Sequence, residues 1–164
     1  MSETLYCSDC KQLLNIKCFS KGFIRSENVG WCKLCRNKHD KKKRNLRLEK
    51  GICVRCQKEK PPNCGNYCEY HHIEAMVCRN FGRKINVKEV ADYLYQKIQA
   101  QNYTCPYIGE TLVLGVNAHI DHIYPKARFP ALATNLNNLE WVGKDANYAK
   151  RDLTREEFTI FAGK

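Results

Sequence analysis

Two short strings of the sequence carry residue types that the cleavage of a phosphodiester bond requires. The first places Asp121 beside His122, and the second places Lys150 three residues after Asn147. Hydrolysis of a phosphodiester needs a base that takes a proton from water, a charge that offsets the phosphoryl oxygens, and a group that holds the phosphate in line. The chemistry that these strings favour is therefore metal-assisted phosphodiester hydrolysis.

Each residue type suits one of these tasks. Imidazole titrates nearest to neutral pH, which makes His122 the candidate general base. Asp121 and Asn147 offer oxygen atoms to a hard divalent cation such as Mg²⁺. Lys150 follows Asn147 by one helical turn, so both side chains would project from one helix face. We expect the ammonium group of Lys150 to meet a phosphate oxygen.

Two strands and a helix must position these residues. The sequence predicts a strand over 118–124, an antiparallel partner over 139–142, and a helix from about 144 to 151 that begins after Gly143. Side chains alternate along a regular strand, so Asp121 and His122 would point to opposite faces. A site that uses both side chains then needs a local twist or bulge.

Two further helices are predicted around this core. Apolar residues recur at helical spacing over 86–101, with Asn86 as the N-cap. A capping box formed by Thr154 and Glu157 begins a short C-terminal helix. We expect that helix to turn Phe158 and Phe161 towards the core.

Cysteine is the second source of chemistry in the chain. The 164 residues include 11 cysteines, and several fall in Cys-x-x-Cys pairs. No apolar signal-peptide segment opens the sequence. This pattern favours reduced thiols that bind zinc over a secreted disulfide framework, with at least one thiol left over from the odd count.

Two zinc modules are predicted from the spacing of these pairs. The first ligand set is Cys7, Cys10, Cys32 and Cys35. The second set that we favour is Cys53, Cys56, Cys68 and His71. Cys64 is the first alternative in the second set, because Cys64-x3-Cys68 is a competing spacing, and His72 is a further candidate. Four protein ligands close a zinc site to catalysis, so both ions would be structural.

Basic charge is concentrated in residues 36–50. This segment holds eight basic and two acidic residues, which is +6 of the net charge of +11. Such a block indicates a polyanion as partner, and the alternative reading is a solvated helix that joins two metal modules. The residues expected to contact DNA are Lys41, Lys42, Lys43, Arg44 and Arg47. No apolar run approaches membrane-spanning length.

The C-terminal half resembles the HNH endonuclease family, also called the ββα-metal nucleases. Three strings carry the resemblance, namely Asp121-His122-Ile-Tyr-Pro, Asn138-Leu and Asn147-Tyr-Ala-Lys150. The step of nine residues between the two asparagines matches the family spacing. The segment Cys105-Pro-Tyr-Ile-Gly-Glu is similar to the lead-in of some members. The first half is only loosely similar to zinc modules of phage members.

The resemblance implies a role for each matching residue. Asp121 and Asn147 would be ligands of Mg²⁺ or Mn²⁺, and His122 would be the base. Asn138 would organise the following loop and orient the base, and Lys150 would contact phosphate. The family also implies DNA as the partner and products that carry a 5′-phosphate and a 3′-hydroxyl.

Three features depart from the family pattern or stay open. The loop over 126–137 lacks the usual glycine-rich turn, although Arg128 in that loop can touch phosphate. Many members have a Cys-x-x-Cys pair beside the core, where this chain has Gly143 and Ala146, so packing must stabilise the core instead. His119 stands where members vary, and it is either structural or part of another metal site.

We therefore predict an α+β chain with small zinc-bound modules followed by a ββα-metal (HNH) nuclease domain. The divisions are a zinc ribbon with a basic helix (1–50), a second zinc module (51–78) and the nuclease domain (85–164). The expected activity is divalent-metal-dependent DNA endonuclease activity in a reducing, cytoplasmic setting of a bacterial, phage or organellar host. The alternatives are a non-catalytic zinc-dependent DNA-binding protein and a nuclease selective for branched DNA. Monomer and homodimer both stay open, as do homing, restriction and phage DNA processing.

Overall fold

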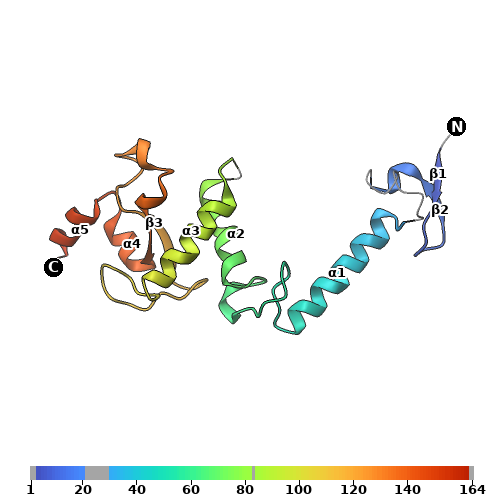
Figure 1. Ribbon diagram of the computed structural model, residues 1–164, viewed down its shortest axis with the longest axis horizontal. Helices are drawn as coiled ribbons and strands as arrows, with labels where there is room; N and C mark the ends of the chain where they lie inside the picture. The colour runs from blue at the N-terminus through green and yellow to red at the C-terminus, as the bar shows by residue number, and fades with distance from the viewer. Residues whose placement is uncertain (1–2, 21–29, 83, 163–164) are drawn as a thin grey trace. The chain divides into compact units, whose positions relative to one another are not determined.

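The computed structural model describes residues 3–20, 30–82 and 84–162 (Figure 1). These residues form two compact units, Met1–Lys50 and Gly51–Lys164. The fold is mixed α+β, as predicted, and the strands of the described residues pair as small antiparallel sheets. Among the described residues, the structure has no helix that is both long enough and apolar enough to cross a bilayer.

The first unit joins a small hairpin to one long helix. Strands β1 (Thr4–Tyr6) and β2 (Leu13–Asn15) pair antiparallel, and a short 3₁₀ helix, η1 (Ile16–Cys18), follows. Four side chains form the buried core here, namely Cys7, Phe19, Cys32 and Cys35. With so little apolar area to bury, this unit depends on its cysteines for stability.

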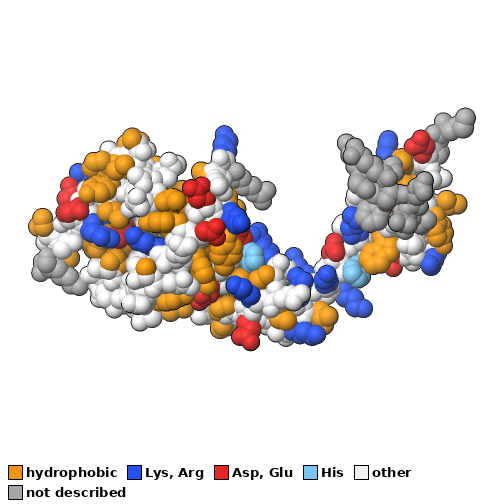
Figure 2. Space-filling model, in the orientation of Figure 1, with side chains coloured by type: hydrophobic (Ala, Val, Ile, Leu, Met, Phe, Trp, Pro, Cys, Tyr) orange, Lys and Arg blue, Asp and Glu red, His pale blue; other side chains and the backbone are white. Residues whose placement is uncertain are grey.

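The basic segment is helical, as expected. Helix α1 spans Lys33–Glu49, and its buried residue is Cys35, in the first turn. Lys41, Lys42, Lys43 and Arg44 are all exposed along it. Figure 2 shows Lys and Arg side chains gathered over this helix. Beyond Cys35, α1 has no buried face that packs against the rest of the described unit. Charged side chains therefore occupy nearly the whole circumference of the helix.

Two packed helices open the second unit. After the short 3₁₀ helix η2 (Pro62–Cys64), α2 spans Glu69–Phe81 and α3 spans Val87–Ala100. The Asn86 side chain accepts a hydrogen bond from the backbone N–H of Glu89, which confirms the predicted N-cap of α3. A second hairpin consists of β3 (Ala118–His122) and β4 (Leu139–Gly143). Helix α3 lies between α2 and this hairpin (Figure 1) and contacts both.

One hydrophobic core runs through this unit. It contains Ile73 and Val77 of α2, Leu94 and Ile98 of α3, and Trp141 of the second hairpin. Helix α2 was not predicted, and it crosses the expected end of the second zinc module at residue 78. The segments over 51–78 and 85–164 consequently fold together and share their buried surface, rather than forming separate modules.

The second hairpin has the predicted arrangement. Strand β3 (Ala118–His122) pairs antiparallel with β4 (Leu139–Gly143), and helix α4 (Lys144–Lys150) follows directly. Every residue of β4 is buried. The Trp141 indole donates to the Leu94 carbonyl at 2.8 Å, while the Gln101 side chain exchanges hydrogen bonds with the Trp141 backbone.

The opposite face of β4 is closed by polar contacts. Glu140 is fully buried, and its carboxylate accepts hydrogen bonds from the Tyr107 hydroxyl and the Arg155 guanidinium. Arg155 begins helix α5 (Arg155–Phe161), whose capping box of Thr154 and Glu157 is confirmed. Phe158 is buried as expected, but Phe161 is 75% exposed because the helix ends beyond the edge of the core.

Candidate functional site

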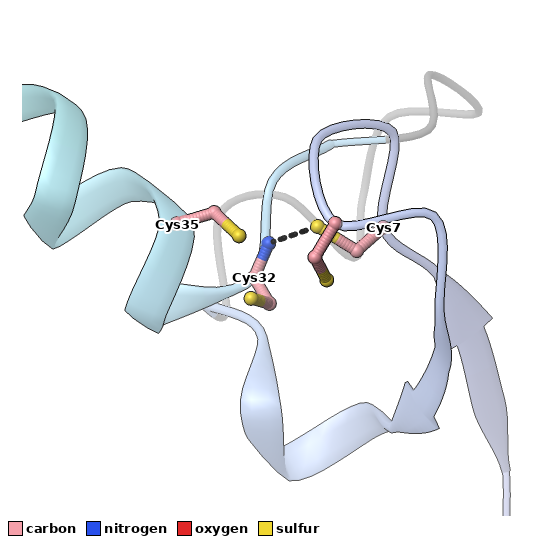
Figure 3. A group of neighbouring side chains, drawn as sticks. Cys7, Cys32 and Cys35 are labelled. Atoms are coloured by element: carbon pink, nitrogen blue, oxygen red, sulfur yellow. Dashed lines mark hydrogen bonds between the residues drawn. The ribbon is translucent and has the colours of Figure 1, made fainter.

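The first cysteine cluster assembles as predicted. Its four sulfur atoms lie within 4.8 Å of one another. The ligands are Cys7, Cys10, Cys32 and Cys35. Figure 3 shows Cys7, Cys32 and Cys35 turned towards one point, with the Cys32 backbone N–H donating to Cys7 Sγ at 3.2 Å. This arrangement can hold a zinc ion in a closed site.

One thiol in each cluster is prepared for metal binding by its surroundings. Burial raises the pKa of Cys7, but backbone N–H donors, chiefly that of Cys32, outweigh burial and lower the pKa to about 6. The pKa of Cys53 in the second cluster is likewise lowered to about 6, where burial is outweighed chiefly by the N–H of Cys68. The lowered pKa of each group favours the thiolate, the form that binds zinc.

The second cluster shows which of the alternative ligands come together. It contains Cys53, Cys56, Cys68 and His71, the favoured set. Cys56 and Cys68 have sulfur atoms 3.7 Å apart. Two thiolates bound tetrahedrally at about 2.3 Å from zinc would be separated by almost the same distance. Cys64 instead lies buried in the core, with its sulfur 3.9 Å from the Leu114 carbonyl oxygen.

His71 ties the second cluster to α2. Its Nδ1 atom faces the sulfur atoms of Cys53 and Cys68 at 3.4 and 3.2 Å. Its Nε2 atom lies 3.8 Å from a carboxylate oxygen of Glu74, which is paired with Arg55 at 2.7 Å. A carboxylate behind a ligand imidazole fixes the ring and its tautomer. A metal here would fasten the loop that carries Cys53 to the first turn of α2.

A separate cavity of about 500 Å³ lies against the second hairpin. Its lining includes His119 and His122 from β3, Asn147 from α4, Lys126 from the loop after β3, and Phe81 from α2. The structure thus brings the expected base, His122, to the same cavity as one expected metal ligand, Asn147. Asp121 is not among the described residues that line this cavity.

The His122 ring is held in a defined orientation. Its Nε2 atom lies 3.0 Å from the Ala133 carbonyl oxygen, and Phe81 packs with its ring centroid 6.0 Å away. A carbonyl oxygen only accepts hydrogen bonds, so a hydrogen bond here places a proton on Nε2, and in the neutral ring the lone pair is then on Nδ1. The neutral imidazole can therefore take a proton at Nδ1.

Asn138 organises the loop that holds this ring. Its side-chain amide donates to the carbonyl oxygens of Tyr124 and Leu132 at 2.9 and 3.1 Å. Its Oδ1 atom accepts from the Tyr124 backbone N–H at 2.7 Å. Leu132 precedes Ala133, whose carbonyl oxygen contacts the His122 ring, so Asn138 fixes the loop that holds this ring. That Asn138 orients a catalytic base stays a prediction.

Asp121 and Lys150 form a buried ion pair. Lys150 is 0% exposed, and its Nζ atom lies 3.0 Å from Asp121 Oδ2 and donates to the His122 carbonyl oxygen at 2.7 Å. This position does not suit the expected phosphate contact, because the ammonium group is enclosed. Asp121 Oδ2 is buried, and the Lys150 ammonium group is the charged partner that the described residues give it.

Arg128 is also engaged within the chain. Its guanidinium group binds both carboxylate oxygens of Glu157, at 2.5 and 2.9 Å, and donates to the Asp152 carbonyl at 3.2 Å. The Arg128 guanidinium is the main reason that the pKa of Glu157 falls to about 2. The pair joins the loop after β3 to α5, and this replaces the expected phosphate contact.

His119 is the site residue whose role the sequence left open. Its Nδ1 atom lies 3.2 Å from the side-chain nitrogen of Asn147, and Tyr148 packs edge-on against its ring at 6.0 Å. His119 is two residues before Asp121, on the same side of β3. This spacing of two residues is the sequence signal that places His119 on the same side of the strand as the predicted ligand Asp121.

Comparisons of the chain with models of protein families, with curated proteins and with solved structures found no match.

Proposed function

We propose that this protein is a divalent-metal-dependent DNA endonuclease whose cutting site is the cavity beside β3 and α4. The observation that carries the proposal is the His122 ring, which lines that cavity with its Nε2 atom committed to the Ala133 carbonyl. An imidazole that lines a polar cavity, and whose lone pair is on Nδ1 when the ring is neutral, suits removal of a proton from water. The exposed basic helix α1 supports DNA as the substrate.

Two oxygen ligands for the catalytic ion are proposed, one from Asp121 and one from Asn147. Asn147 lies one turn before Lys150, the charged partner of the Asp121 carboxylate, so α4 carries the amide on the same face as that partner. Such a carboxylate and amide pair fits a hard divalent ion, Mg²⁺ or Mn²⁺. When bound, the ion would offset charge that develops on the phosphoryl oxygens.

The residues around the ion have separate tasks in this proposal. His122 accepts the proton of the attacking water, and Asn138 holds in place the loop that orients the ring. Lys150 positions the Asp121 carboxylate from the protein interior. Lys126, exposed at the rim of the cavity, takes over the phosphate contact first expected of Lys150. Both zinc clusters serve folding.

Nicking of supercoiled plasmid tests the proposal directly. We expect zinc-loaded protein to convert supercoiled DNA to the nicked form when Mg²⁺ or Mn²⁺ is added, and to leave it intact when the ion is omitted. Omitting the ion is a better control than a strong chelator, because a chelator would also attack the cysteine clusters. Protein that binds plasmid and never nicks it, with either ion, would be the non-catalytic DNA-binding protein considered above.

Helix α1 should supply much of the non-specific DNA affinity. Reversing Lys41, Lys42 and Lys43 to glutamate is expected to weaken binding to all sequences alike. Each lost phosphate contact should also reduce the slope of log affinity against log salt concentration by about 0.9. Titrations of labelled duplexes at several salt concentrations measure both quantities.

The matched control reverses three exposed lysines elsewhere in the chain, Lys58, Lys84 and Lys88. Net charge changes by the same amount, so a general electrostatic effect would appear equally in both triple variants. An unchanged salt slope in the α1 variant would remove this helix from the DNA interface.

A further inference from the structure

The geometry points to His119 as a third ligand of the catalytic ion, which makes the site a mixed nitrogen and oxygen site that selects Mn²⁺ over Mg²⁺. This inference rests on the proposed function and adds a residue and an ion preference to it.

The first argument is the face of β3 that meets α4. His119 and Asp121 are two residues apart on the strand and share one side of it. His119 contacts Asn147 and Asp121 pairs with Lys150, and these two partners are three residues apart on the helix. Two strand residues and two helix residues therefore face each other in consecutive pairs. An ion held by Asp121 and Asn147 would lie between these pairs, within reach of His119.

The second argument is the contact between His119 and Asn147. The imidazole Nδ1 atom and the amide group are 3.2 Å apart and line the same cavity. The oxygen and nitrogen atoms of an amide are nearly isosteric. Turning the Asn147 amide over would aim its Oδ1 atom and the His119 lone pair at a shared position. Tyr148 packs against the His119 ring and restricts its rotation.

The third argument is the chemistry of the ligand set. Mg²⁺ takes oxygen ligands almost exclusively and keeps several waters. Imidazole nitrogen binds the later divalent ions more readily, and Mn²⁺ accepts both nitrogen and oxygen ligands. A site with one imidazole, one carboxylate and one amide would therefore favour Mn²⁺. The two cysteine clusters would not compete for this ion once they are loaded with zinc.

Binding of Mn²⁺ without DNA gives a test that does not depend on cleavage. The zinc-loaded protein is titrated with Mn²⁺, free ion is followed by its electron paramagnetic resonance signal, and Mg²⁺ is added as a competitor. His119→Ala should weaken Mn²⁺ binding ~10-fold or more and leave competition by Mg²⁺ nearly unchanged. His119→Asp, which makes an all-oxygen site, should restore binding with Mg²⁺ now the better competitor.

The control is His39→Ala, which removes an exposed imidazole from α1, outside this site. It should bind Mn²⁺ as the parent protein does, and thermal unfolding of each variant checks that the hairpin still folds. If both His119 variants bind Mn²⁺ as tightly as the parent, or lose Mn²⁺ and Mg²⁺ in equal proportion, His119 is not a ligand.

Plasmid nicking separates the two proposals. Nicking by the parent protein together with unchanged ion binding in the His119 variants overturns the inference and leaves the proposed function standing. A parent protein that binds no Mn²⁺ and nicks no plasmid overturns both.

Discussion

Replacing His122 with alanine is expected to slow DNA cleavage by roughly 10²–10⁴-fold, the usual contribution of a general base. DNA affinity should stay nearly intact, since the exposed lysines of α1 are unaffected. Single-turnover cleavage of a labelled duplex at saturating protein measures the rate, and a binding titration without divalent ion measures the affinity.

His122→Gln separates the chemical role of this side chain from its structural role. The glutamine amide can still donate a hydrogen bond to the Ala133 carbonyl, as the Nε2 atom of His122 does. It cannot take a proton from water, so cleavage should be lost as in the alanine variant while thermal stability is kept. Substantial cleavage by the glutamine variant would assign His122 to loop structure alone.

The second large effect is expected on stability rather than rate. Lys150→Ala would leave the Asp121 carboxylate buried without a partner, and we expect the free energy of unfolding to fall by about 3–5 kcal/mol. The His122 carbonyl would also lose a hydrogen-bond donor. Urea denaturation followed by tryptophan fluorescence is suitable, because Trp141 is fully buried in the same unit.

Lys144→Ala is the matched control, because Lys144 is exposed on the same helix. It should change stability by less than about 0.5 kcal/mol. A second comparison combines Lys150→Met with Asp121→Asn, which removes both charges and should recover most of the lost stability. If Lys150→Ala were as stable as Lys144→Ala, the ammonium group would not be compensating a buried charge.

The hairpin and its following helix were predictable because their signals are local. Glycines before the segment over 118–124 marked β3 as extended, and Gly143 marked the turn into α4. Both zinc ligand sets also followed from the spacing of cysteine and histidine. The choice of His71 over Cys64 needed the fold, since only packing shows that the Cys64 side chain is enclosed beside Leu114.

The roles of the charged residues could not be predicted in the same way. Helical spacing puts Lys150 on the same face as Asn147, but it does not say what lies opposite that face. The opposite residue is Asp121 of β3, and enclosure between strand and helix turns an expected DNA contact into an internal ion pair. Arg128 likewise met Glu157, 29 residues further along the chain.

Helix α2 joins two sites that share no residue. Cys68 caps its start, His71 lies in its first turn, and Phe81 at its end packs against the His122 ring. The helix is about 20 Å long, so a zinc ion bound at its start would influence how the His122 ring is held at its far end. If the proposed function is right, protein purified in a buffer that strips zinc would lose cleavage although every residue beside β3 and α4 were intact.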